Sequence, residues 1–229
     1  MGAAVVKGGS VDEIGAVAVL ADPVRRRLYD AVSVATVPIG REEAAHLAAV
    51  PLHTARFHLD KLVDAGLLEV SYARLTGRSG PGAGRPAKLY TRSAAEVTVS
   101  LPHRSYDLVG GVLAAALERT LSGAPAADAL REEARSRGRR LGTSYDGAGD
   151  DLDRAAGALA TQGFEPRRDD DEVCLHNCPF DALATEHTAL VCGVNLDFVT
   201  GVLDGLGCTA AEARLQPDAE HCCVRLRAR

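Results

Sequence analysis

Six cysteines lie in the last quarter of this 229-residue chain, and the first 173 residues contain none. They are Cys174, Cys178, Cys192, Cys208, Cys222 and Cys223. Thiols can ligate zinc or an iron–sulfur cluster, form disulfides, or fill a hydrophobic core. These roles require different spacings and neighbours, so the segments around the cysteines decide between them.

Two of these roles are structural. Disulfides are rare in the cytoplasm, and we expect a cytoplasmic protein because the N-terminal segment has no apolar stretch long enough for a signal peptide. Free thiols, by contrast, are common core residues. Cys208 fits the core role best, since it follows the sequence GLG and precedes TAAEARL.

A zinc site is a third reading. Zinc sites usually show two cysteines separated by two to four residues, or two histidines at similar spacing. Cys174 and Cys178 fit loosely as one such pair, whereas the adjacent Cys222 and Cys223 do not fit as the other. The histidines that could complete a mixed set are His176, His187 and His221.

An iron–sulfur cluster is a fourth reading. Such a cluster takes thiolates from separate segments, often on loops with backbone N–H groups nearby. Cys178 is followed by Pro179, and a bacterial ferredoxin motif also ends in Cys-Pro, although a dipeptide is weak evidence. The residues alone leave the cluster, zinc and inert thiols open.

Charge is shared unevenly along the chain. Residues 1–92 contain 12 Lys or Arg and 9 Asp or Glu, whereas residues 93–229 contain 14 and 22. Between Ser71 and Arg92 there are five basic residues and no acidic one. A local basic zone on a chain of net charge −5 predicts a focused contact with a polyanion.

The first part of the chain has the element order of a winged helix-turn-helix, which we expect at residues 12–95. Asp22 is a predicted N-cap, Pro23 a first-turn residue and Gly66 a C-terminal stop. Helices are expected at 11–22, 22–32, 40–50 and 51–66, and strands at 67–75 and 88–93 around a loop rich in Gly and Pro. The side chains expected to face inward are Leu28, Ala31, Val32, Ala44, Leu47, Ala48, Ala55, Leu59, Leu62 and Val63.

The helix at 51–66 is the one expected in the major groove of DNA. Arg56 can hold guanine with two hydrogen bonds, and the Thr54 methyl or the Phe57 ring can contact a thymine methyl. Lys61, one turn further on, is better placed for a phosphate. The DNA-binding residues expected on this helix are His53, Thr54, Arg56, Phe57 and Lys61. An ordinary solvated helix face is the alternative reading.

The loop between the two strands is expected to act as the wing. Arg85 stands between the flexible Gly84 and the stiff Pro86, and an arginine held in this way can enter a narrow minor groove. Lys88, in the same basic zone, is a second expected DNA contact. The alternative is a surface loop whose arginine only increases solubility.

This half of the chain resembles the ArsR-like winged-helix regulators. The matching segments are LADPVRRRLYDAV, TARFHLDKLVDAGLLE and GRPAKLYTRS, which together cover roughly residues 18–93. Metal-sensing members of that group often carry a cysteine pair on the third helix, and here the helix REEAAHLAAV has none. The resemblance therefore implies a DNA-binding regulator but not metal sensing of that type.

The second half predicts a mixed helix and strand unit, so the fold class expected for the chain is α+β. Helices are expected at 104–121, 124–142, 150–163 and 195–207, and strands at 164–175 and 222–229. We expect 102–143 to form bridging or dimerisation helices and 150–229 to form a cysteine-rich sensor domain. No run of about 18 uninterrupted apolar residues occurs, so no membrane span is expected.

The segments LHNCPF, LVCGVNLDFVTGVLDGLG and RLQPDAEHCCVRL resemble the C-terminal half of SufR-type repressors. Those winged-helix proteins carry a [4Fe–4S] cluster and control iron–sulfur assembly genes. The family pattern maps onto Cys178, Cys192 and Cys222 as implied cluster ligands. Cys174 is the first choice for the fourth ligand, with His187 and Cys223 in reserve.

The resemblance implies a redox-sensing repressor whose cluster state controls operator binding. We expect a homodimer on palindromic double-stranded DNA, in which the helices at 104–142 carry a change of the cluster domain to the spacing of the DNA-binding domains. Catalysis is not expected, because no Gly-rich nucleotide loop, Ser/His/Asp set or paired catalytic carboxylates stand out. The alternative is a regulator of the same fold with a structural zinc or a thiol redox switch.

Overall fold

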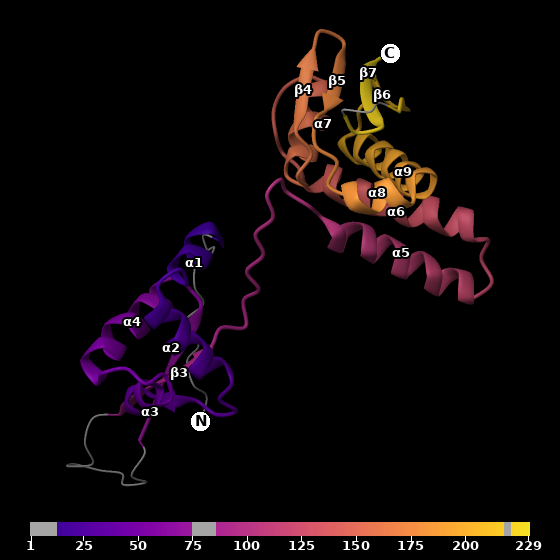
Figure 1. Cartoon of the computed structure of the whole chain (residues 1–229). Coiled ribbons are helices and arrows are strands. Elements are labelled where there is room, and N and C mark those ends of the chain that lie inside the picture. Colours follow the sequence, from indigo (N-terminus) through magenta and orange to yellow (C-terminus); the bar gives the residue numbers. More distant parts are fainter. Residues whose placement is uncertain (1–12, 75–85, 218–220) are drawn as a thin grey trace. The chain divides into compact units, whose positions relative to one another are not determined.

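The computed structural model describes residues 13–74, 86–217 and 221–229. The chain divides into two compact units, Met1–Val99 and Ser100–Arg229. Figure 1 gives the element labels. The segment 102–143, which we expected to form bridging helices apart from the sensor domain, belongs to the second unit. The reason is the close packing of its second helix on the core of that unit.

The first unit is a three-stranded antiparallel sheet with helices packed beside it (Figure 1). The strand order is β1-β3-β2, so the short first strand pairs with the last. Helix α4 is the second helix of the helix-turn-helix and follows α3 after a short turn. The elements are α1 (Glu13–Val19), α2 (Pro23–Ser33), β1 (Ile39–Gly40), α3 (Arg41–Leu47), α4 (Leu52–Asp64), β2 (Leu68–Ala73) and β3 (Ala87–Arg92).

Local sequence signals fix these helices. The Asp22 carboxylate accepts hydrogen bonds from the backbone N–H groups of Val24 and Arg25, at 2.8 and 3.0 Å, and Pro23 opens α2 as predicted. Gly66 follows α4 with a φ of 73°, the left-handed conformation that ends a helix. The prediction that Leu47 faces inward was wrong. Leu47 is the last residue of α3 and is exposed, whereas Ala44 and Ala45 of the same helix are buried in the core.

The second unit is a four-stranded antiparallel sheet with helices packed on it, so the chain as a whole is α+β. The strand order is β4-β5-β7-β6, which places β7 between β5 and β6. Helix α9 packs against β6 and β7, and α7 packs against β4, β5 and β7. The elements are α5 (Tyr106–Leu121), α6 (Ala126–Ser144), α7 (Asp151–Ala160), β4 (Pro166–Asp169), β5 (Glu172–Leu175), α8 (Asp181–Glu186), α9 (Thr188–Leu206), β6 (Ala211–Leu215) and β7 (Val224–Ala228).

Helices α6 and α9 cross with their backbones in contact. Gly138 and Gly142 of α6 face α9, and Gly201 and Gly205 of α9 face α6, each pair one turn apart. A Cβ placed on any of the four would come within 2.0–2.4 Å of a backbone oxygen of the other helix. Only glycine therefore permits this crossing, which joins the α5–α6 hairpin to the central helix of the second unit (Figure 1).

Helix α9 begins at Thr188, seven residues before the predicted start, so Cys192 lies on a helix rather than before one. Among the described residues, this helix is long and apolar enough to cross a membrane by length and composition alone, with a mean hydropathy of 1.5. Ten of its residues are buried in the second unit, among them Phe198, Val199 and Val202. Its apolar composition is that of a core helix.

Candidate functional site

The exposed face of α4 carries the residues expected to contact DNA. His53, Arg56, Phe57 and Lys61 are exposed and Thr54 is half-buried. The Phe57 ring is 58% exposed, although the ring lies edge-on to His58 at 5.2 Å between centroids. The spacing 53, 56, 57 and 61 places these side chains on one side of the helix. A large apolar ring beside cationic and polar groups suits contact with base edges and phosphates.

Two DNA contacts were expected outside the helix, Arg85 in the wing and Lys88 at the start of the second strand. Lys88 is half-buried, forms an ion pair with Asp60 of α4, and lies over the Tyr90 ring at 5.2 Å. That ion pair connects β3 to α4. It also neutralises the positive charge of Lys88, which is then less available to bind a DNA phosphate. Arg85 lies outside the described residues. Lys61 is within 3.9 Å of Asp64, but both side chains are open to solvent, so this pair is weak.

Four cysteine side chains meet in the second unit, and we call them the thiol centre: Cys178, Cys192, Cys222 and Cys223. The Cys178 side chain hydrogen-bonds to that of Cys222. Cys223 hydrogen-bonds to Cys222 and also to Cys192. All six cysteines of the chain are free of disulfides. The thiol centre therefore joins residues from three separate parts of the sequence.

Three elements position the thiol centre. Cys178 lies in the loop after β5, Cys192 on the N-terminal part of α9, and Cys222 and Cys223 directly before β7. Because β5 and β7 are neighbours in the sheet, the loop and the approach to β7 lie side by side. The backbone N–H of Cys222 donates to the carbonyl of Leu175 at 2.9 Å, which fixes this arrangement.

Cys174, the expected fourth ligand, lies elsewhere. It is on β5 between Val173 and Leu175, whose side chains are buried in the same core as Cys192 and Cys222. Because side chains alternate along a strand, Cys174 is on the opposite face of the sheet. Cys178, four residues later, is free of this alternation because β5 ends at Leu175, and the loop that follows turns its side chain towards the core.

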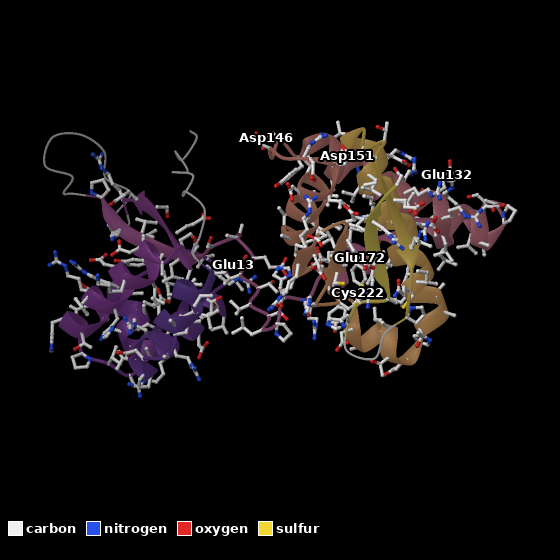
Figure 2. All side chains as sticks on the ribbon, turned by 90° about the horizontal axis from the view of Figure 1, so that it is seen from above. Glu13, Glu132, Asp146, Asp151, Glu172 and Cys222 are labelled. Carbon is white, nitrogen blue, oxygen red and sulfur yellow. The ribbon has the colours of Figure 1, made fainter. Side chains whose placement is uncertain are left out.

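Cys208 and His187 are also outside the thiol centre. The Cys208 thiol lies 3.6 Å from the carbonyl oxygen of Asp151 on α7. Asp151 and Cys222 lie well apart in the second unit (Figure 2). His187 is exposed between α8 and α9. His176 and His221 instead contact each other edge to face, at 4.4 Å between ring centroids.

Burial and mutual contact raise the pKa values of Cys178, Cys192 and Cys222. The hydrogen bond to Cys222, followed by burial, raises the pKa of Cys178 far above its ordinary value. The hydrogen bond from Cys178 works to lower the pKa of Cys222, but the contact with Cys223 and burial outweigh it and raise that pKa to about 11. Burial also raises the pKa of Cys192. Metal or cluster binding must displace these protons, because the ligand is the thiolate.

Asn195 is a buried polar residue that contacts the thiol centre. Its side chain is 1% exposed, and its amide nitrogen donates to the Sγ of Cys222 at 3.0 Å. Its amide oxygen is buried without a hydrogen-bond partner in the described part of the chain. An unsatisfied buried group of this kind costs about 1–3 kcal/mol. A polar residue kept at that cost in contact with the Cys222 thiol points to a role at the site.

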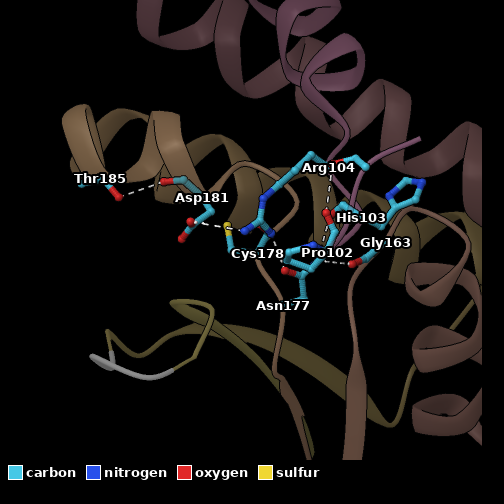
Figure 3. Close-up of polar contacts among 9 residues, drawn as sticks. Pro102, His103, Arg104, Gly163, Asn177, Cys178, Asp181 and Thr185 are labelled. Carbon is cyan, nitrogen blue, oxygen red and sulfur yellow. Dashed lines mark hydrogen bonds and ion pairs between the residues drawn. The ribbon is translucent and has the colours of Figure 1, made fainter. Parts of the chain in front are cut away.

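The loop that carries Cys178 is held by the segment 103–105, at the start of the second unit (Figure 3). The Arg104 guanidinium donates to the side-chain oxygen of Asn177 and to the Cys178 carbonyl, the latter at 3.0 Å. It also lies 3.4 Å from the Asp181 carboxylate. The Asn177 amide donates to the carbonyls of His103 and Gly163, at 2.8 and 2.6 Å. The Cys178 loop is therefore hydrogen-bonded to residues that lie shortly after the boundary between the two units.

The four thiols of the thiol centre are of the kind that ligates an iron–sulfur cluster. Within residues 13–74, 86–217 and 221–229, no three His, Cys, Asp or Glu side chains are grouped to hold one ion. In a [4Fe–4S] cluster each of four thiolates binds a different iron, and N–H groups stabilise the sulfur charge. Here Cys192, Cys222 and Cys223 are buried, Cys178 is half-buried, and the four thiols are joined by pairwise contacts. The backbone N–H groups of Phe180 and Val224 hydrogen-bond to Cys178 and Cys222, and Asn195 adds a third donor.

Sequence reasoning missed Asn195 and Arg104 and ranked Cys223 below Cys174. A signal for Asn195 was present, because it stands three residues after Cys192 in an otherwise apolar segment and so shares its helix face. No signal marked Arg104, whose partners are more than 70 residues away.

The comparisons with known proteins bear on the first unit. The helix-turn-helix domain family matches residues 20–71, which begin directly after α1 and run through α4 into β2. No curated protein and no solved structure matches the chain. The matched segment contains the exposed face of α4 and the core that positions it. Together they make this chain a DNA-binding transcriptional regulator with an N-terminal helix-turn-helix domain.

Proposed function

We propose that this protein is a transcriptional repressor that holds a [4Fe–4S] cluster at the thiol centre and binds its operator according to the state of that cluster. The observation that carries the proposal is the meeting of Cys178, Cys192, Cys222 and Cys223 from three segments of one buried region. Cys223 takes the place first given to Cys174. From the SufR resemblance, iron–sulfur assembly genes are the proposed targets.

The thiolates and the apolar residues around them have different roles in the proposed site. The four thiolates would hold the cluster, which when bound supplies a centre that gains or loses an electron and is lost when iron is scarce or oxidants are abundant. The raised pKa values of Cys178, Cys192 and Cys222 mean that these thiols release protons when they become ligands. Phe198, Phe180 and Val191 keep the region apolar and limit the access of water.

Control of DNA binding is proposed to pass through the segment 103–105. Arg104 and Asn177 tie this segment to the Cys178 loop, so a loop that shifts when the cluster is lost must break or strain those hydrogen bonds. The residues before this segment lead to the DNA-binding unit. The segment with these hydrogen bonds and the segment without them are two discrete states, and regulation by a cluster requires two such states.

The proposed partner of the chain is a second copy of itself on a palindromic operator. Helix-turn-helix dimers bind half-sites about 34–36 Å apart, so one copy reads only half of such a site. Helix α5 carries Leu117 and Leu121, which are 58% and 79% exposed and lie one turn apart. Replacing both by Glu should convert a dimer to a monomer in analytical ultracentrifugation while the circular dichroism stays native. An unchanged dimer would assign the contact to another surface.

The deciding experiment is anaerobic purification, followed by an absorption spectrum and analysis of iron, acid-labile sulfide and zinc per chain. Four irons and four sulfides, with a broad absorption in the blue, support the cluster. An operator selected from random DNA then tests control, because loading or removing the cluster should change the affinity. A colourless protein with one zinc, or with neither metal, leads to the alternative.

That alternative is a regulator of the same fold with a structural zinc or a thiol switch. Of the two, the thiol switch is favoured, because the side chains of the adjacent Cys222 and Cys223 are in contact. A thiol switch predicts that mild oxidant changes the operator affinity of metal-free protein and that a reductant restores it. In a cluster regulator, the metal-free protein should not respond in this way.

A further inference from the structure

We propose that Asn195 donates a hydrogen bond to the cluster-bound thiolate of Cys222 and thereby raises the reduction potential of the cluster. The inference rests on the proposed function and assigns a task to a residue that is not a ligand. Asn195 lies on α9 one turn after Cys192, so its side chain is on the helix face that carries a thiol of the centre.

The first argument is geometric. The amide nitrogen of Asn195 lies 3.0 Å from the Sγ of Cys222, and both residues are almost fully buried. The backbone of Cys222 is fixed to Leu175 of β5, and Asn195 is fixed by α9. Neither group can move away easily, so the contact persists when the thiol becomes a ligand.

The second argument concerns the unpaired amide oxygen. An asparagine with a purely structural role would satisfy both ends of its amide, but here the oxygen has no partner among the described residues. A thiol can donate or accept, whereas a thiolate can only accept. Once Cys222 is a thiolate, only the orientation with the nitrogen towards sulfur is favourable. The residue is thus matched to the ligand form of Cys222.

The third argument is electrostatic. Reduction adds one negative charge to a cluster and its thiolates, and a donor aimed at sulfur stabilises the more negative state. In a region with little water, such a donor has a larger effect than it would have in solution. The Asn195 amide should therefore make the cluster easier to reduce.

The test compares Asn195→Leu, which keeps the volume and removes the donor, with Asn195→Gln, which keeps an amide. Thr200→Val is the matched control, because Thr200 is on the same helix and its hydroxyl donates to Leu196 rather than to a thiol. The midpoint potential is measured by anaerobic titration with redox dyes. We expect a lower potential in Asn195→Leu, a smaller change in Asn195→Gln, and the wild-type value in Thr200→Val. A wild-type potential in Asn195→Leu would overturn the inference.

A second measurement needs no variant. The chain has two asparagines, Asn177 and Asn195, and Asn177 donates to two carbonyls. In protein labelled with ¹⁵N in the asparagine side chains, pulsed electron paramagnetic resonance of the reduced cluster should detect one coupled side-chain nitrogen. Absence of that coupling in a protein with full iron and sulfide content refutes the role of Asn195 alone. Absence of iron and sulfide from the wild type refutes the proposed function instead.

Discussion

The backbone of Gly138 lies directly against the backbone of Phe198, so closely that a Cβ on the glycine would come 2.0 Å from the Phe198 carbonyl oxygen. Gly138→Ala should therefore force α6 and α9 apart and lower the free energy of unfolding by about 1–3 kcal/mol or more. Chemical denaturation measures this. Gly110→Ala is the matched control, because a Cβ there meets open space and should stabilise α5 by about 0.5–1 kcal/mol. Equal effects of the two changes would disprove the crossing.

Serine variants of the cysteines separate the thiol centre from the other thiols. Loss of Cys178, Cys192, Cys222 or Cys223 opens an iron to solvent, so each variant should hold less iron and sulfide than the wild type or lose them quickly in air. Cys174→Ser and Cys208→Ser should hold the full amount, because neither thiol reaches the centre. Full loading of Cys223→Ser together with loss in Cys174→Ser would restore Cys174 as the fourth ligand.

Arg56 is the residue of α4 whose loss should most reduce base recognition. If its guanidinium holds a guanine, Arg56→Ala should weaken binding to the selected operator by about 1–3 kcal/mol and change binding to random DNA much less. Fluorescence anisotropy at a fixed salt concentration gives both affinities. Equal losses on the two DNAs would make Arg56 a phosphate contact.

Arg104→Leu should separate cluster binding from the control of DNA binding. The variant removes hydrogen bonds to Asn177 and to the Cys178 carbonyl but no thiol. We expect cluster content close to that of the wild type and an operator affinity that no longer differs between the loaded and the cluster-free protein. A full difference in affinity would show that another part of the second unit carries the signal.

Cys208 should ionise late. Burial, followed by the nearby charge of Asp151, raises its pKa to about 11 from an ordinary value of 9.0. Because only the thiolate reacts with alkylating agents, its alkylation in native protein should still rise about tenfold per pH unit between about pH 8 and 10. The pKa of Cys208 is higher in the folded protein than in the unfolded chain, so the folded state holds this proton more tightly. The resulting contribution to the free energy of unfolding is fully present below pH 9 and is lost as the pH rises from 9 towards 11. Site-resolved mass spectrometry follows the label, and a plateau near about pH 9 would contradict this assignment.

The first unit could be predicted in most particulars because its signals are local. Asp22 with Pro23, the apolar spacing of Leu28, Ala31 and Val32, and Gly66 each act within a few residues. The prediction for Leu47 was wrong because the sequence does not show at which residue α3 ends.

The second unit was harder because its site is made by distant pairings. The start of α9 was missed since Thr188 has no side-chain cap in front of it and the segment TALVCGV reads equally well as a strand. Cys223 could not be preferred to Cys174 by spacing alone. The choice depends on which face of β5 is buried and on the bend that precedes β7.

The position of β7 has a consequence for the order of folding. It follows β4, β5 and β6 in the sequence, yet it lies between β5 and β6 in the sheet. The sheet consists of two local hairpins, β4–β5 and β6–β7, which join only when β7 pairs with β5, and this pairing brings Cys222 and Cys223 to the Cys178 loop. A pairing so distant in sequence forms late, because the entropy of closing the long loop must be overcome first. A half-folded second unit therefore lacks the complete thiol centre, so under the proposed function a cluster would be retained only by a chain whose sheet is complete.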